Sequence, residues 1–129
     1  MDRTPLAEAT IVRRVEEGDL ASLLGDLPPV LATTRMIAFM ELAGAKCLEP
    51  LLGDGETSVG VDVQVRHAAA TPAGVEVRCS ARFLHAEGKL HWFEVWAEDP
   101  GGEIGRGRHS RAIVQAARIL SGATRRTGG

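Results

Sequence analysis

The feature that most constrains this chain is a long helical pattern between Val30 and Leu52, with a single acid at the edge of its apolar stripe. At about 100° per residue, the stretch VLATTRMIAFMELAGAKCLEPLL predicts one wide apolar face. That face comprises Met36, Ile37, Met40, Ala43, Gly44, Cys47, Leu48 and Leu51. Glu41 lies about 80° from the centre of the face, away from the charged residues opposite. We expect Glu41 either to pair with a surface arginine or cap a strand, or to act as a base or nucleophile in a cleft.

Five strand-like segments accompany the helix. Residues 8–18 alternate weakly and predict an edge strand, and four further runs follow the helix at 58–72, 75–83, 90–98 and 103–115. Tight turn sequences such as DPGG join them. The order predicts an α+β fold, an antiparallel sheet of about five strands wrapped around one long central helix. Apolar residues on both faces of 90–98 suggest that a second subunit covers the far face.

We expect one domain over residues 1–120 and a small, basic, disordered tail at 121–129. The net charge of −2 gives no reason to expect nucleic acid as a partner. No apolar run approaches the roughly 20 residues of a membrane span, and the first ten residues lack a signal-peptide pattern. The two cysteines lie far apart in the sequence, which is typical of reduced thiols in a cytoplasmic protein.

His67 and Thr33 are the other candidates for chemistry. His67 continues the alternation of Val59, Val61, Val63 and Val65, so we expect it to face the apolar side at a strand end. It is either a core histidine or a general base. Thr33 or Thr34 would cap the helix, where free backbone N–H groups could also hold an oxyanion.

The other three histidines, His85, His91 and His109, show no paired spacing and are interpreted as structural or exposed. No HxxxH or HExxH motif is present, so we expect no metal site. Phosphate-binding and serine-nucleophile motifs such as GxSxG are likewise missing from the sequence.

Three stretches carry a resemblance to a known family: VLATTRMIAFMELA, SVGVDVQVRHAAATPAGVEV and EIGRGRHSRAIV. They resemble hotdog-fold acyl-CoA thioesterases, and within these the fluoroacetyl-CoA thioesterase family, over residues 26 to 115. The resemblance implies a sheet curled around a central helix and a homodimer with its sites near the subunit interface. It implies no cofactor, because coenzyme A is part of the substrate.

The resemblance also implies site residues. Thr33, Glu41 and His67 match the family's catalytic set and would meet between helix and sheet. The Gly60 amide would hold the thioester carbonyl, and Arg111 would lie near the bound acyl-CoA.

The implied reaction is hydrolysis of an acyl-CoA thioester, with a short acyl chain, to the free acid and CoA. Glu41 would attack the carbonyl or activate water, His67 would serve as base for water, and Thr33 would align Glu41. Leu27 stands in the loop before the helix, where the family has a phenylalanine lid, so the acyl group is left open. The alternatives are a non-catalytic hotdog protein that binds or sequesters acyl-CoA, and a hotdog hydratase or dehydratase acting on acyl thioesters.

Overall fold

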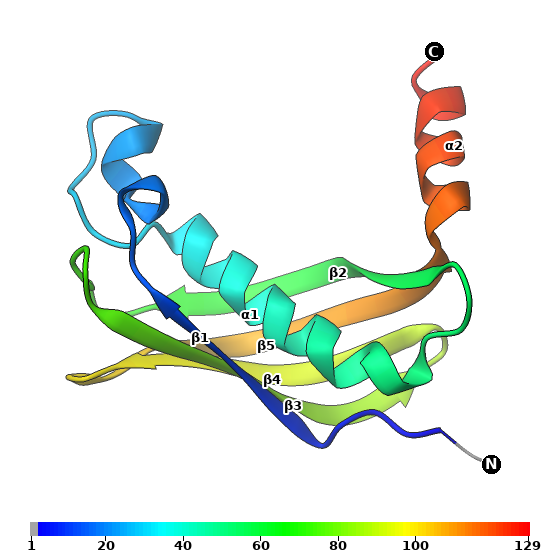
Figure 1. Cartoon of the computed structure of the whole chain (residues 1–129), viewed down its shortest axis with the longest axis horizontal. Helices are drawn as coiled ribbons and strands as arrows, with labels where there is room; N and C mark the ends of the chain where they lie inside the picture. The colour runs from blue at the N-terminus through cyan, green and yellow to red at the C-terminus, as the bar shows by residue number, and fades with distance from the viewer. Residues whose placement is uncertain (1–2) are drawn as a thin grey trace.

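In a computed structural model that describes residues 3–129, a single antiparallel sheet curves around a central helix (Figure 1). The elements are β1 (Glu8–Arg14), α1 (Thr33–Leu48), β2 (Glu56–His67), β3 (Glu76–Glu87), β4 (Leu90–Asp99), β5 (Gly102–Gln115) and α2 (Ala116–Arg126). Short 3₁₀ turns occupy Glu17–Asp19, Ala21–Leu24 and Glu49–Leu51. The five strands are ordered β1-β3-β4-β5-β2. The predicted α+β class, with about five strands around one helix, is confirmed.

The start of α1 differs from the prediction by one residue. Ala32 is the N-cap, and its carbonyl accepts hydrogen bonds from the amides of Arg35 and Met36. Thr33 is therefore the first helical residue and makes no capping hydrogen bond. Its hydroxyl is free to bond elsewhere.

The core lies between α1 and the middle of the sheet. The buried residues of the helix are Met36, Phe39, Met40, Ala43, Gly44, Cys47 and Leu48. They meet the inward side chains of β3 and β4, namely Val77, Cys79, Ala81, Phe93, Val95 and Ala97. The predicted apolar face is confirmed except at its edges, because Phe39 is buried and Ile37 is only half-buried.

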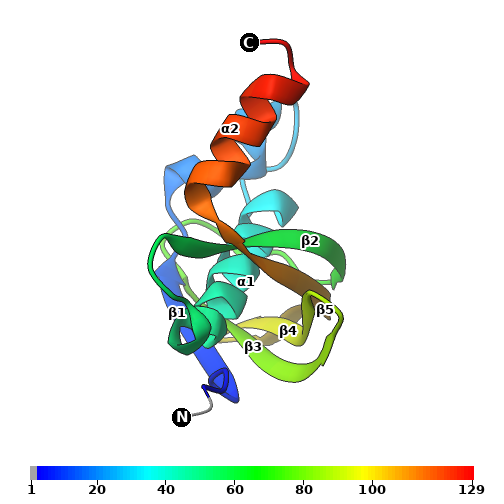
Figure 2. The ribbon, with the colours of Figure 1, turned by 90° about the vertical axis from the view of Figure 1, so that its right-hand side faces the viewer.

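Helix α1 lies toward one side of the sheet. It packs most closely against β3 and β1, while β2 forms the opposite edge beyond β5 (Figure 2). Two valines of β2 are consequently exposed, Val61 at 53% and Val63 at 44%. An open edge with apolar side chains and unpaired backbone groups is a surface that favours strand pairing.

A β-bulge interrupts β2 at Val61. Gly60 pairs with Arg111 and Asp62 pairs with Ser110, so Val61 has no partner on β5. The extra residue changes which side chains face the helix. Gly60 faces α1 before the bulge, and Val65, five residues later, also packs against the core. The predicted unbroken alternation from Val59 to His67 was therefore wrong.

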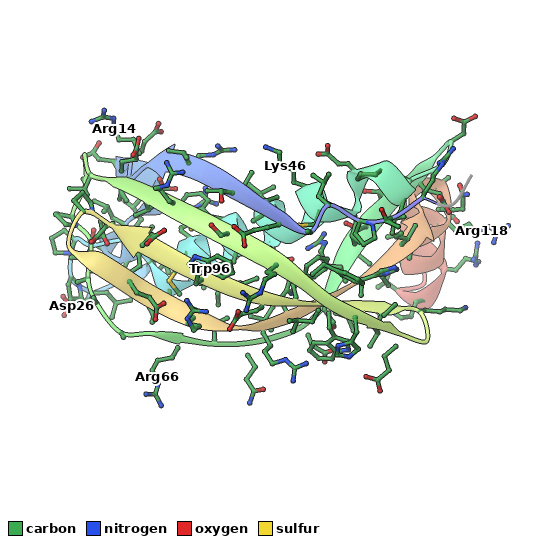
Figure 3. All side chains as sticks on the ribbon, turned by 90° about the horizontal axis from the view of Figure 1, so that it is seen from below. Arg14, Asp26, Lys46, Arg66, Trp96 and Arg118 are labelled. Carbon is green, nitrogen blue, oxygen red and sulfur yellow. The ribbon has the colours of Figure 1, made fainter. Side chains whose placement is uncertain are left out.

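The chain's own arginines lie over two tryptophans on the outer face of the sheet, the face that the sequence predicts to be covered by a second subunit. Arg106 lies over the ring of Trp96 at 5.2 Å, and Arg108 lies over Trp92 at 5.1 Å. Figure 3 shows Trp96 on this face among charged side chains. Guanidinium stacking shields a tryptophan from water while its own charge stays solvated.

The C-terminal segment forms helix α2, which rises away from the sheet (Figure 1). Residues 121–126, which belong to the segment that the sequence predicts to be a disordered tail, lie in this helix. Arg125 and Arg126 lie in the last turn, where positive charge interacts favourably with the helix dipole. None of the helices within residues 3–129 is both long and apolar enough to cross a membrane.

Candidate active site

Thr33 and His67 are brought together by the return of β2 toward the start of α1. Thr33 Oγ1 lies 2.8 Å from His67 Nδ1, a hydrogen-bonding distance. Both side chains line an open pocket, which also includes Ala21, Val30, Leu31 and the run Ala68, Ala69 and Ala70. Of the three residues that the sequence analysis expects to meet, Thr33 and His67 thus lie together.

The two ring nitrogens of His67 differ in their surroundings. Nε2 is buried and has no hydrogen-bond partner among the described residues. Burial lowers the pKa of His67 below its ordinary value of 6.5, so the imidazole is neutral at neutral pH. When Nδ1–H donates to Thr33 Oγ1, Nε2 presents a lone pair, which is what a general base requires.

Glu41 does not join this pair within one chain. It lies eight residues after Thr33, which is about 12 Å along the helix axis. Its carboxylate faces a different groove, lined by Arg35, Ala38, Phe39, Leu42, Ala45 and Arg111. Over the part of the chain that the structure describes, no hydrogen bond links Glu41 to Thr33 or His67, so the expected alignment of Glu41 by Thr33 is not observed.

Glu41 is instead paired with Arg111. Arg111 Nη1 lies 3.2 Å from Glu41 Oε2, and the guanidinium is almost fully buried while the carboxylate is 40% exposed. Arg111 Nε donates to Ser58 Oγ and Nη2 donates to the Ser58 carbonyl, both at 2.9 Å. Burial lowers the pKa of Arg111 and the Glu41 carboxylate opposes that shift. The arginine remains charged, because its ordinary pKa is so high.

Gly60 lies directly beside this ion pair. A Cβ built on Gly60 would lie 2.4 Å from Glu41 Oε2 and 3.1 Å from His109 Cε1, so a larger residue would require the carboxylate to move. The structure thus brings together Glu41, Gly60 and Arg111, and separately Thr33 and His67.

The family model described as fluoroacetyl-CoA-specific thioesterase, FlK, matches residues 15–117. The chain belongs to the FlK family. Its relative, the fluoroacetyl-CoA thioesterase of Streptantibioticus cattleyicolor, is 39% identical over 89 residues, covering 69% of this chain and 64% of the relative. The match therefore spans slightly less than two thirds of that relative's length.

Solved structures agree with this membership. A structure of the fluoroacetyl-CoA thioesterase FlK superposes with a TM-score of 0.88 at 30% identity, covering 97% of each chain. A hot-dog-like protein from Thermanaerovibrio acidaminovorans superposes with a TM-score of 0.84 at 23% identity, covering 97% of this chain and 93% of that one. The fold is the hotdog fold that the sequence resemblance implied.

The segment before α1, where FlK-family resemblance placed a lid, holds Leu27 at the surface. Leu27 is 52% exposed, and Leu23 and Leu24 are each 66% exposed. The segment's ends are fastened, because the Ala21 amide donates to the Val30 carbonyl at 2.8 Å. Leu27 does not line the Thr33 pocket in the single chain.

His109, which the sequence analysis interpreted as structural or exposed, lies buried next to the Glu41–Arg111 pair. The side chain is 1% exposed and lies beside Arg111, two residues further along β5. Alternation along β5 was the available signal, because residues two apart share a face. Residues 3–129 hold no cluster of three His, Cys, Asp or Glu side chains that could bind a metal ion.

Proposed function

We propose that the protein is an acyl-CoA thioesterase that works as a homodimer, with each active site built from both subunits. The observation that carries this proposal is the separation of two half-sites on one chain. Thr33 and His67 hold a neutral imidazole with a free nitrogen, and Glu41 with Arg111 holds a carboxylate. Neither half alone has all the groups that hydrolysis of a thioester needs.

The open edge of β2 is the surface through which we expect two subunits to pair and bring their half-sites together. Two copies of β2 pairing antiparallel about a two-fold axis near Asp62 would run in opposite directions, so the end of one copy would lie beside the beginning of the other. The partner subunit's His67 would then lie closer to Gly60 along the strand than the chain's own His67 does. Within one chain the separation is seven residues, or roughly 23 Å. The exposed Val61 and Val63 would become buried at this junction.

The chemistry follows from the two half-sites. The thioester carbonyl would bind beside Gly60, with Glu41 within reach of its carbon, and the partner subunit's His67 would accept a proton from water through Nε2. Glu41 acts either as the nucleophile, whose attack breaks the C–S bond, releases CoA thiolate and leaves an acyl-enzyme anhydride that water hydrolyses, or as the base that activates water to attack the carbonyl and release CoA thiolate directly. In both routes Arg111 fixes the carboxylate.

We propose a short acyl group. Related FlK structures have been determined with acetyl-CoA and with fluoroacetate and CoA. The glycine at position 60 and the tight packing of His109 and Glu41 around it leave a small space at the carbonyl end. Selectivity for fluoroacetyl is a separate matter, because Leu27 provides no aromatic ring at the lid.

We also place the protein in the cytoplasm, on the state of its thiols. Cys47 and Cys79 are both free and buried. Burial raises the pKa of Cys47 to about 11 and that of Cys79 to about 12, so both remain protonated and unreactive. Free thiols are typical of a reducing compartment.

Thiol release from a panel of acyl-CoAs tests the reaction. We expect wild-type turnover on a short acyl-CoA, and a loss of roughly 10²- to 10⁴-fold in Glu41→Gln and in His67→Ala. His85→Ala is the matched control, because the His85 side chain is 47% exposed and lies outside both half-sites. Tight acyl-CoA binding without release by the wild type would favour a sequestering protein, and hydration of an enoyl-CoA would favour a hydratase.

Mixing the two inactive variants tests the shared site. Refolding Glu41→Gln together with His67→Ala gives hybrid dimers in which one site of two carries both native groups. Random pairing then restores about a quarter of wild-type activity. Mixing Glu41→Gln with Arg111→Met is the control, because both changes damage the same half-site and no native site results. Zero recovery in the first mixture, with dimers shown by light scattering, would contradict the shared site.

A further inference from the structure

A fully buried histidine, His109, contacts the arginine of the Glu41–Arg111 pair. His109 Nε2 lies 3.1 Å from Arg111 Nη1, the same nitrogen that meets Glu41. His109 Nδ1 lies 2.8 Å from the backbone carbonyl oxygen of Asp62. The imidazole therefore connects the arginine on β5 to the bulged part of β2.

Hydrogen-bond chemistry fixes the proton on this ring. A carbonyl oxygen only accepts, so His109 Nδ1 carries the hydrogen. A guanidinium only donates, so Nε2 must present its lone pair to Arg111. Both contacts are satisfied together only by the neutral Nδ1–H tautomer.

The surroundings favour that neutral form. Burial lowers the pKa of His109 below its ordinary value of 6.5, and the facing Arg111 guanidinium lowers it further. Glu41 from α1 and Asp62 from β2 act in the opposite direction. A protonated ring would point an N–H at Arg111 and would place two positive groups in contact.

Two glycines make the space that this arrangement needs. A Cβ on Gly44 would lie 3.3 Å from both Arg111 Cδ and His109 Cδ2. A Cβ on Gly60 would lie 3.1 Å from His109 Cε1. The imidazole is thus held between α1 and β2 with no room to rotate.

The bulge in β2 positions the Asp62 carbonyl oxygen, which accepts the hydrogen bond from His109 Nδ1. The Asp62 amide donates to Ser110 Oγ at 3.1 Å, and Ser110 Oγ donates to Asp62 Oδ2 at 2.6 Å. The Asp62 carbonyl oxygen accepts the hydrogen bond from His109 Nδ1 next to these contacts. Side chains of β5 thus hold the bulge, which adjoins Gly60.

We propose that His109 is a positioning residue, whose Nε2 lone pair orients the Arg111 guanidinium against Glu41 while its Nδ1–H holds the bulge next to Gly60. This inference rests on the proposed thioesterase activity for its catalytic consequence. Its structural part, the tautomer and the restraint on Arg111, can be measured without substrate.

Two substitutions separate the two hydrogen bonds. His109→Asn places an amide near the former Nδ1, so it can still donate to Asp62 but gives Arg111 no acceptor. His109→Gln reaches the former Nε2 position, so its carbonyl oxygen can accept from Arg111. We expect kcat to fall roughly 10- to 100-fold in His109→Asn with a smaller change in KM, because a misplaced reacting group mainly affects the chemical step. We expect His109→Gln to retain at least several-fold more turnover than His109→Asn.

Nitrogen NMR supplies the readout that activity does not. Imidazole ¹⁵N signals at pH 7.5 should show the Nδ1–H tautomer in the wild type. The two Arg111 Nη groups should give separate signals in the wild type and in His109→Gln, and should average by rotation in His109→Asn. His85→Asn, at an exposed position, is the control for a histidine substitution that leaves turnover unchanged.

The outcomes distinguish the two proposals. An Nε2–H or protonated ring at pH 7.5 overturns the positioning role, as does equal kcat in well-folded Asn and Gln variants. Equal losses in both variants that follow their loss of thermal stability also overturn it, because the role would then be structural only. A wild type that releases no thiol refutes the thioesterase, while the tautomer and the Arg111 signals still decide the positioning role.

Discussion

Two of the arginines on strand β5, Arg106 and Arg111, face opposite sides of the sheet, and each is paired with at least one carboxylate. Arg106, on the outer face, meets Glu94 at 3.0 Å and Glu103 at 2.8 Å, and its side chain is 45% exposed. Arg111, on the inner face, meets Glu41 at 3.2 Å and is 7% exposed. The two pairs have the same chemistry and similar distances, so burial is the main difference between them.

Burial determines what each pair can do. Water can replace any partner of Arg106, so an exposed pair of this kind contributes about 0–1 kcal/mol. Arg111 has no such replacement for its bonds to His109 and Ser58, because the surrounding atoms exclude water. An arginine in that position has one orientation, and it transmits that orientation to Glu41. Ion pairs on the outer face shield the tryptophans, whereas the inner pair fixes the carboxylate that we propose to react.

Removing the inner arginine should have the largest effect. Arg111→Met should reduce turnover roughly 100-fold or more, because Glu41 loses the group that orients it. We also expect the free energy of unfolding to fall by about 1–3 kcal/mol, because the Ser58 carbonyl and His109 Nε2 lose their donor. Steady-state kinetics and urea denaturation measure the two effects. Full activity in this variant would show that the buried pair has no role in the reaction.

Filling the space beside Glu41 should affect activity more than stability. In Gly60→Ala the new methyl group would lie 2.4 Å from Glu41 Oε2, which is the flexible end of a side chain and can move away. We expect turnover to fall roughly 10- to 100-fold, since small displacements of a reacting group are costly, with a small change in melting temperature. Gly18→Ala is the matched control, because nothing lies within 4 Å of a Cβ at that position.

Lowering the pH should reduce the free energy of unfolding through two histidines of the inner face, His67 and His109. The pKa values of His67 and His109 are lowered in the folded state, so the unfolded chain binds more protons than the folded chain just below pH 6.5. Stability should therefore decrease as the pH falls from 6.5, and the decrease should be smaller in His109→Gln. Melting temperatures at pH 7.5, 6.5 and 5.5 test this, and an identical pH dependence in the variant would exclude a contribution from His109.

Removing the carboxylate of the outer ion pairs should have the smallest effect on stability and turnover. Glu94→Gln removes the carboxylate shared by Arg82 and Arg106, yet all three side chains are at least 26% exposed. We expect a loss of no more than about 1 kcal/mol in unfolding free energy and unchanged turnover. A larger loss would mean that stacking on Trp96 depends on this charge, and that the inner and outer pairs differ less than their burial implies.

Periodicity predicted the fold well and the site in part. The alternation of strands and the apolar face of α1 were sufficient for the architecture, because each depends on local spacing. Glu41 was found from its angle on the helix, and pairing with an arginine was considered for it, although with a surface arginine rather than with the buried Arg111. Resemblance to the family supplied Gly60 and Arg111, which spacing alone would not have singled out.

Other features depend on contacts that spacing does not encode. The bulge at Val61 is held by Ser110, from a strand that follows about 50 residues later, so the alternation of β2 gave no sign of it. The stacking of Arg106 on Trp96 is another such contact, because apolar periodicity carries no information about arginine stacking. The distance between Thr33 and Glu41 was available from helical rise alone, and it argued against a meeting within one chain.

The bulge at Val61 also means that the site depends on a register that changes part-way along one strand. Gly60 faces the helix in one register, and Val65 and His67 face it in the next. Deleting Val61 would leave composition, charge and hydropathy almost unaltered, yet it would turn either Gly60 or His67 to the opposite side of the sheet. The length of β2, counted in single residues, is therefore as much a part of the site as the identity of its side chains. Insertions and deletions in this strand should be tolerated far less well than substitutions.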